Sequence, residues 1–162
     1  MKILALDQAT ITSGYAIYDY KNKKLIDSGL IKAEKKLPIN ERINVIVEKV
    51  MALIDKEKIE AVCYEQIPKI KGVTTAIKLA KLAGAIEYIL TNKNMLYAEI
   101  NVNSHKKQFG ITSRKRDEQK AEAIKIVKML YKKDVNDDEA DAISIGNYFV
   151  NNVVVEVRNE TN

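Results

Sequence analysis

The stretch "LALDQATITSGYAIYD", residues 4–19, decides the predicted fold. A buried-strand pattern ends on Asp7, and after a short Thr/Ser/Gly turn a second apolar strand begins at Gly14. One interpretation makes Asp7 an ordinary turn residue, because Asp is common in turns. The other makes it a carboxylate held at the end of a sheet to bind a cation. The rest of the sequence has to decide between the two.

The composition is that of an ordinary globular chain with a modest basic excess. The 162 residues are 46% hydrophobic and 30% charged, with a formal net charge of +5. The apolar runs are all shorter than the ~20 residues that span a bilayer, and the N-terminus does not resemble a signal segment. Cys63 stands in the apolar run "AVCYE" and is expected to be a small core residue. We expect a cytoplasmic protein with a single domain over 1–162, in which 153–162 form a short strand or a frayed tail.

Basic and acidic residues are separated along the chain. Residues 105–133 hold ten Lys or Arg and three acids, and 68–81 hold four lysines and no acid. Residues 134–141, by contrast, hold five acids. A chain that needs charge only for solubility would mix the signs more evenly. The distribution permits a nucleic-acid partner.

Apolar periodicity predicts an α/β fold. Short apolar runs predict five strands, over 2–7, 14–20, 25–33, 60–65 and 95–100, with a hairpin turn at 22–24. Helical spacing predicts four helices, within 38–58 and over 74–91, 117–131 and 138–151. Asn40 is the expected N-cap of the first helix. Three meandering strands followed by alternating helices and strands imply a mixed sheet with helices on its faces.

Four acids stand where the ends of these elements can converge. Asp7 ends the first strand and Glu65 the fourth, and parallel neighbours would place both at the sheet's carboxyl edge, where open α/β sheets bind ligands. Asp138 and Asp141 open the last helix, and their spacing of three puts them on one face. Four clustered carboxylates repel one another unless cations neutralise them, and hard oxygen ligands suit Mg²⁺ or Mn²⁺. The pattern predicts a site for two such ions, about 3.5–4 Å apart.

Three stretches carry a family resemblance: "ILALDQATITSGYAIYD", "AVCYEQIP" and "DDEADAISIGNYF". In this order and spacing they resemble the RuvC-type Holliday-junction resolvases, a branch of the ribonuclease H-like nucleases, and the compact chain is similar to the phage-encoded members. The resemblance implies a five-stranded sheet with its first three strands antiparallel, a homodimer, and Mg²⁺-dependent cutting of two strands of a four-way junction. The catalytic acids that it implies are Asp7, Glu65, Asp138 and Asp141.

Two basic segments are predicted to contact DNA phosphates, which positions a strand without reading its sequence. One segment directly follows Glu65, and the other is "NVNSHKKQFGITSRKRDEQK", residues 101–120. The second resembles the family's basic segment, in which a lysine and glycines precede another lysine near the site. The predicted DNA-binding residues are Lys69, Lys71, Lys106, Lys107, Arg114, Lys115 and Arg116.

Within 101–120 the resemblance weakens. Lys106 or Lys107 matches the family's first lysine, but Thr112 stands where a second glycine is expected and Arg116 stands where the second lysine belongs. Because Lys120 lies one helical turn beyond Arg116, it is the alternative second lysine. We assign the catalytic roles to Lys107 and Lys120.

Neighbouring residues are given plainer roles. Asp134, Asp137 and Glu139 are expected to be solvated charges at a helix N-terminus, with Asp137 as the substitute ligand. His105, the only histidine, is expected to be a surface residue in a DNA-facing loop. Phe109 either stacks on a base at the junction centre or anchors that loop in the core.

Small residues recur every four positions along the predicted helix 74–91. Such a ridge lets another helix come close, and a dimer like that of the family would pack there. The alternative is packing onto the protein's own sheet. A two-fold dimer would carry two identical sites to two symmetric strands of a junction. The predicted interface residues are Ala76, Ala80, Ala83 and Gly84.

The sequence therefore predicts a metal-dependent, structure-selective DNA endonuclease that resolves four-way junctions by paired nicks, leaving 5′-phosphate and 3′-hydroxyl ends. A broader nuclease for forks, flaps or three-way junctions is an alternative, which the altered 110–120 segment favours. Further alternatives are an RNA-processing nuclease and a non-catalytic junction-binding protein, although a binder of polyanions gains nothing from clustered acids. The opening motif is also similar to that of sugar kinases, but their ATP cleft needs two such domains.

Overall fold

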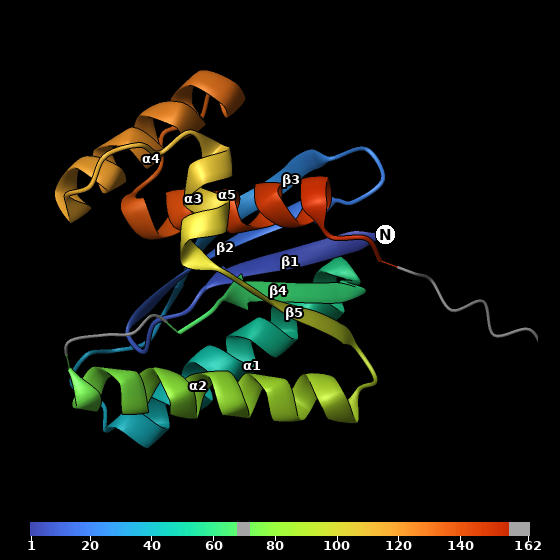
Figure 1. The fold of residues 1–162 in the computed structure, drawn as a ribbon. Helices are drawn as coiled ribbons and strands as arrows, with labels where there is room; N and C mark the ends of the chain where they lie inside the picture. The colour runs from blue at the N-terminus through green and yellow to red at the C-terminus, as the bar shows by residue number, and fades with distance from the viewer. Residues whose placement is uncertain (68–71, 156–162) are drawn as a thin grey trace, which may run out of the picture.

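The described part of the chain folds around a five-stranded mixed sheet (Figure 1). The computed structural model describes residues 1–67 and 72–155. The strands are β1 Lys2–Asp7, β2 Thr12–Asp19, β3 Lys24–Lys32, β4 Ala61–Glu65 and β5 Leu96–Ile100, in the spatial order β3-β2-β1-β4-β5. The first three pair antiparallel, whereas β4 pairs parallel with both β1 and β5. This arrangement confirms the predicted fold class.

Helices cover both faces of the sheet. They are α1 Ile39–Glu57, α2 Val73–Asn92, α3 Val102–Phe109, α4 Arg116–Tyr131 and α5 Asp137–Asn152. Figure 1 shows α1 and α2 on one face and α3, α4 and α5 on the other. Side chains of β1 alternate between two apolar clusters, with Leu4 and Leu6 on the α1–α2 side and Ile3 and Ala5 on the α5 side. A strand buried on both faces reads as a continuous apolar run, which is what the sequence shows. Cys63 is buried in the second of these clusters, as predicted.

The sequence pattern did not predict α3. The Asn101 side chain caps this helix by accepting from the backbone N–H groups of Asn103 and Ser104, at 3.0 and 3.3 Å. Gly110 ends it in the left-handed region, with φ of 90°. Only His105 and Phe109 of its eight residues are buried. Two buried positions are too few for a helical period to stand out in the sequence.

The predicted N-cap of α1 is wrong. Pro38 occupies the cap position, and Asn40 is the second residue of the helix. Proline suits a helix start because its fixed φ is already helical and it has no N–H group to satisfy. A sequence rule that looks first for Asn therefore places the start too late.

The chain beyond α5 is held against the end of β2. The Tyr20 hydroxyl donates to the carbonyl oxygen of Val153 at 2.7 Å and accepts from the N–H group of Val155 at 3.1 Å. The first three residues of the predicted tail are therefore tied to the sheet. Residues 156–162 lie outside the described residues.

Two glycines let α5 lie close to the sheet. A Cβ atom on Gly14 of β2 would lie 1.9 Å from the carbonyl oxygen of Asp138, and one on Gly146 of α5 would lie 2.6 Å from the Tyr18 ring. The Tyr18 hydroxyl donates to the carbonyl oxygen of Ile143 at 3.0 Å, which holds the same two elements together. Because Gly14 pairs with Asp7 across the β1–β2 ladder, the start of α5 comes down beside the end of β1.

Replacing Gly14 should separate α5 from the sheet. We expect Gly14→Ala to lower the free energy of unfolding by about 1–3 kcal/mol, the usual cost of overpacking, because the clash is with backbone atoms. Gly72→Ala is the matched control, since the nearest atom to a Cβ there is Oγ1 of Thr75 at 3.8 Å, an ordinary van der Waals contact. Urea unfolding followed by circular dichroism measures both. Equal stability of Gly14→Ala and the wild type would contradict the packing argument.

Candidate active site

The carboxyl ends of β1 and β4 place two acids side by side. The parallel register pairs Leu6 with Tyr64, so Asp7 and Glu65 are the next residues of neighbouring strands. The first turns of α5 bring Asp138 and Asp141 to the same edge, because α5 packs on β1 and β2. The structure therefore gathers all four predicted acids at one end of the sheet.

Burial and mutual repulsion disfavour charge on these carboxylates. The pKa of Asp7 is raised well above its usual value, mainly by burial and then by the negative charges of Asp141, Glu65 and Asp138. Burial is also the main cause of the raised pKa values of Asp138 and Asp141. The positive charge of Lys106 opposes this effect at Asp7 and Asp141. The site is therefore an acidic centre with a deficit of positive charge.

The donor set fits a divalent cation. Carboxylate oxygens are the ligands that Mg²⁺ and Mn²⁺ prefer, and a bound cation would relieve the repulsion that raises these pKa values. Among residues 1–67 and 72–155, no group of three or more His, Cys, Asp or Glu side chains is close enough to hold an ion as it stands. The four acids interact electrostatically, since the charges of Asp141, Glu65 and Asp138 add to the effect of burial on the pKa of Asp7.

Asp137 is engaged elsewhere. Lys120 of α4 donates a hydrogen bond to its carboxylate, and this bond is the main reason that the pKa of Asp137 is lowered. The charges of Lys120 and Arg116 partly oppose the rise in the pKa of Asp138, which burial and the charge of Asp137 cause. Lys120 thus lies near the acids, as predicted, while Asp137 serves as its partner. This pairing favours Asp138 as the ligand.

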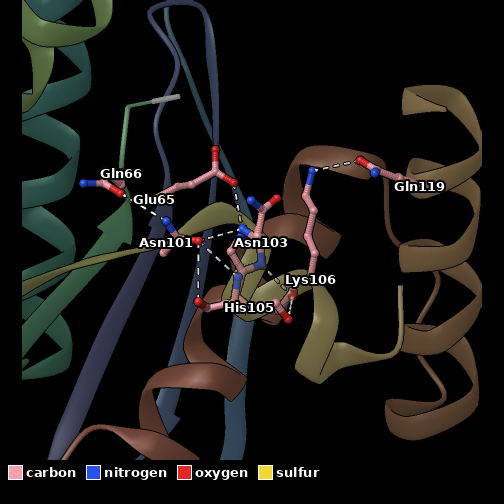
Figure 2. Close-up of polar contacts among 9 residues, drawn as sticks. Glu65, Gln66, Asn101, Asn103, His105, Lys106 and Gln119 are labelled. Carbon is pink, nitrogen blue, oxygen red and sulfur yellow. Dashed lines mark hydrogen bonds and ion pairs between the residues drawn. The ribbon is translucent and has the colours of Figure 1, made fainter. Parts of the chain in front are cut away.

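His105 is buried in the site, so its prediction as a surface residue is wrong. Its side chain is 0% exposed and lies between Glu65 and Ser144. Figure 2 shows it beneath the Glu65 carboxylate, on the same short helix as Lys106. The sequence held one signal for this: His105 and Phe109 are four residues apart, the spacing of one helix face. Phe109 is buried as the anchor of that helix, so its exposed stacking role is also wrong.

Of the two adjacent lysines, the structure brings Lys106 to the carboxylates. Lys106 is half-buried, and its Nζ atom donates to Oε1 of Gln119 at 3.3 Å (Figure 2). Lys107, to which the sequence assigned the catalytic role, is exposed. The turn of α3 decides this, because adjacent residues of a helix point about 100° apart.

Three further predicted DNA-binding residues lie where the loop after α3 leads into α4. Arg114, Lys115 and Arg116 are exposed at the start of α4. Glu122 holds the preceding residues in place by accepting from the N–H groups of Thr112 and Ser113, at 2.9 and 3.1 Å. These bonds also lower the pKa of Glu122. Lys69 and Lys71 lie outside the described residues.

Glu139 differs from its prediction as a solvated charge. It is 8% exposed, pairs with Lys133 at 2.7 Å and accepts from the Ser28 hydroxyl at 2.8 Å. Lys133 also donates to the carbonyl oxygen of Ser28 at 2.8 Å. The pair ties the start of α5 to β3, a structural role that a run of acids in the sequence does not reveal.

The small residues of α2 divide between two faces. Ala80 and Gly84 are exposed and Ala76 is half-buried, so these three form one open ridge. Ala83 is buried within the chain, so its prediction as an interface residue is wrong in this structure. Ala83 belongs with the buried residues of α2, which also include Leu82, Ile86 and Leu90.

Fold and site together define a ribonuclease H-like nuclease. The family model described as "Crossover junction endodeoxyribonuclease RuvC" matches residues 3–147, and the chain belongs to this family. It is 32% identical over 148 residues to the protein of that name from Brachyspira hyodysenteriae, covering 90% of this chain and 91% of that one. It is 29% identical to the Fusobacterium nucleatum protein, covering 90% and 77% respectively.

Solved structures share the fold. The Thermus thermophilus RuvC in complex with a Holliday junction substrate has a TM-score of 0.74 at 16% identity, covering 93% of this chain and 95% of that one. A fowlpox virus resolvase with junction DNA has a TM-score of 0.64, also at 16% identity, covering 93% of this chain and 97% of that one. No helix within the described residues is both long and apolar enough to cross a membrane.

The raised pKa values predict a site that destabilises the metal-free protein. The folded state binds protons at Asp7, Asp138 and Asp141 more tightly than the unfolded chain does, so the unfavourable contribution of these groups is fully present at neutral pH. It is relieved as the pH falls through the raised pKa values toward the usual one. We expect Asp7→Asn to raise the free energy of unfolding by about 1–2 kcal/mol at pH 7 without metal.

The matched control is Asp137→Asn, for which no gain in stability is expected. Asp137→Asn removes an acid whose pKa is lowered by Lys120, so it should leave stability unchanged or reduce it slightly. Thermal unfolding in EDTA measures both variants, and added Mg²⁺ should raise the melting temperature of the wild type more than that of Asp7→Asn. A destabilised Asp7→Asn protein would contradict the repulsion argument.

Proposed function

We propose that this protein is a divalent-metal-dependent endonuclease that resolves four-way DNA junctions by paired nicks. The observation that carries the proposal is the convergence of Asp7, Glu65, Asp138 and Asp141 at one end of the sheet, where burial and then the charges of the other three acids raise the pKa of Asp7. Membership of the RuvC family supports it, and the Thermus thermophilus relative was solved with such a junction. We further propose that residues 1–162 form one domain and that the protein acts in the cytoplasm.

The four acids would hold the metal, with Mg²⁺ as the preferred ion, two ions as the proposed number and Mn²⁺ as a substitute. Bound there, the metal would supply charge stabilisation and an activated water for phosphodiester hydrolysis, leaving 5′-phosphate and 3′-hydroxyl ends. Asp7 and Glu65 sit on rigid strand ends, and Asp138 and Asp141 sit on a helix tightly packed on the sheet. Ligands on such elements keep their relative positions better than ligands on loops do.

Positive charge around the acids would bind and orient the DNA. Lys106 lies close enough to influence Asp7 and Asp141, so we propose it as the lysine that stabilises charge on the phosphate. Lys120 and Arg116 stand on the Asp138 side. The exposed residues Arg114 and Lys115, together with Lys69, Lys71 and Lys107, would contact phosphates farther out.

A homodimer would match two sites to the two symmetric strands of a junction. The exposed ridge of Ala76, Ala80 and Gly84 is the proposed contact, and two large apolar side chains extend it. Ile77 and Tyr88 of α2 are 50% and 70% exposed, which is unusual for a face left in water.

Cleavage of an end-labelled four-way junction tests the function. We expect symmetric paired nicks in Mg²⁺, no nicks in EDTA, and a loss of at least about 10³-fold in Asp7→Asn, because a metal ligand is removed. A matched duplex and a single-stranded RNA should remain uncut. Equal cutting of a three-way fork would instead identify a broader branched-DNA nuclease. Tight junction binding without cutting in Mg²⁺ or Mn²⁺ would leave a junction-binding protein and overturn the catalytic proposal.

The adjacent lysines give a second test with an internal control. Lys106→Ala should reduce the single-turnover cleavage rate by about 10²-fold, as expected when one charge-stabilising group is lost. Lys107→Ala should mainly weaken junction binding at raised salt, because an exposed lysine displaces counterions from the backbone. Rates at saturating protein and affinities in Ca²⁺ separate the two effects. A larger rate loss in Lys107→Ala would reverse the assignment.

A further inference from the structure

His105 links the two halves of the acidic centre. Its Nε2 atom lies 2.9 Å from Oε1 of Glu65, and its Nδ1 atom lies 2.9 Å from Oγ of Ser144. Glu65 ends β4, whereas Ser144 belongs to α5, three residues after Asp141. The His105 side chain therefore connects β4, which carries Glu65, to α5, which carries Asp138 and Asp141.

Hydrogen-bond chemistry assigns the direction of each bond. An ionised Glu65 carboxylate only accepts, so the Nε2 atom of His105 must carry a hydrogen and donate to Oε1. With the hydrogen on Nε2 alone, Nδ1 accepts from the Ser144 hydroxyl; a second ring hydrogen would make Nδ1 the donor, and the hydroxyl would then donate to the carbonyl oxygen of His105 at 3.5 Å. Both ring nitrogens are satisfied, as a side chain 0% exposed to solvent requires. One oxygen of Glu65 is engaged, and Oε2 remains for a cation.

The spacing along α5 gives this chain of bonds a geometric effect. Asp141 is three residues from both Asp138 and Ser144, the spacing of neighbouring side chains on a helix surface. Ser144 sets the plane of the imidazole ring, and the ring sets the rotation of the Glu65 carboxylate. The position of Glu65 is thus fixed relative to α5, the helix that carries Asp138 and Asp141.

We infer that His105 is a positioning residue that, held by Ser144, orients Glu65 toward the metal and so sets the metal affinity of the site. The inference rests on the proposed function, in which Glu65 is a ligand. Groups that hydrogen-bond to metal ligands commonly change metal affinity by about 10–100-fold when they are removed. A residue that only fills space would change stability and leave metal affinity unaltered.

Two amide substitutions separate these roles. In His105→Gln the side-chain amide nitrogen can reach the place of Nε2 and still donate to Glu65. In His105→Asn the shorter side chain can replace Nδ1 but does not reach Glu65. Both remove the ring and both leave a polar, uncharged side chain, so they share the loss of packing and differ in the bond to Glu65.

The experiment is a Mn²⁺ titration of the full chain without DNA, followed by the electron paramagnetic resonance signal of free Mn²⁺, with melting temperatures measured in parallel. We expect His105→Asn to weaken Mn²⁺ binding by about 10–100-fold. His105→Gln keeps the donor to Glu65 but loses the contact with Ser144, so it should weaken Mn²⁺ binding only several-fold, less than His105→Asn, even where the two variants lose similar stability. Wild-type affinity in folded His105→Asn, or equal weakening in both variants, would overturn the inference.

Ser144→Ala keeps the inference testable if the His105 variants fail to fold. It leaves the ring in place and removes the bond that orients it, so Mn²⁺ affinity should fall several-fold, less than in His105→Asn. Unchanged affinity in Ser144→Ala would count against the positioning chain. A wild-type protein that binds Mn²⁺ but cuts no junction would overturn the proposed function and leave the role of His105 standing. Normal junction cleavage by the wild type, with unaltered Mn²⁺ affinity in all three variants, would support the proposed function and overturn the role of His105.

Discussion

The close approach of α5 to the sheet is the constraint on which the site depends. Backbone atoms of Asp138 lie where a side chain on Gly14 would be, so only glycine at that position lets the helix come down beside Asp7. Gly146 provides the same relief further along, against Tyr18. Two acids of α5 and two acids of the strand ends can come together because α5 and the sheet are in close contact at these two glycines.

The acidic centre shows a conflict between stability and function. Burial and repulsion disfavour ionised carboxylates at Asp7, Asp138 and Asp141, yet a cation needs them ionised. The rest of the fold outweighs this cost through apolar packing on both faces of the sheet. Lys106 supplies partial compensation by charge, and His105 supplies a hydrogen bond. Unfavourable burial and repulsion of carboxylates, offset by packing elsewhere in the fold, are expected at a site that serves function rather than stability.

The sequence predicted the strands and the acids for the same reason. A strand covered on both faces is apolar throughout, so the polar residue that stops it marks the sheet edge, as Asp7 and Glu65 do. The α5 acids were visible because a spacing of three defines a helix face without reference to the rest of the fold. Lys106 and Lys107 could not be told apart, because the direction of each side chain depends on where α3 starts.

The amino-acid sequence by itself determined the number and positions of the strands, the four acids and the family resemblance, since each follows from local periodicity and motif spacing. Only the tertiary structure decided that His105 is buried against Glu65 and Ser144, and that Glu139 is buried with Lys133. His105 contacts residues that are 39 and 40 positions away in the sequence. Glu139 is buried because Ser28 of β3 and Lys133 cover it. Polar residues read as solvated in a sequence, because local patterns carry no record of the partner that satisfies a buried polar group.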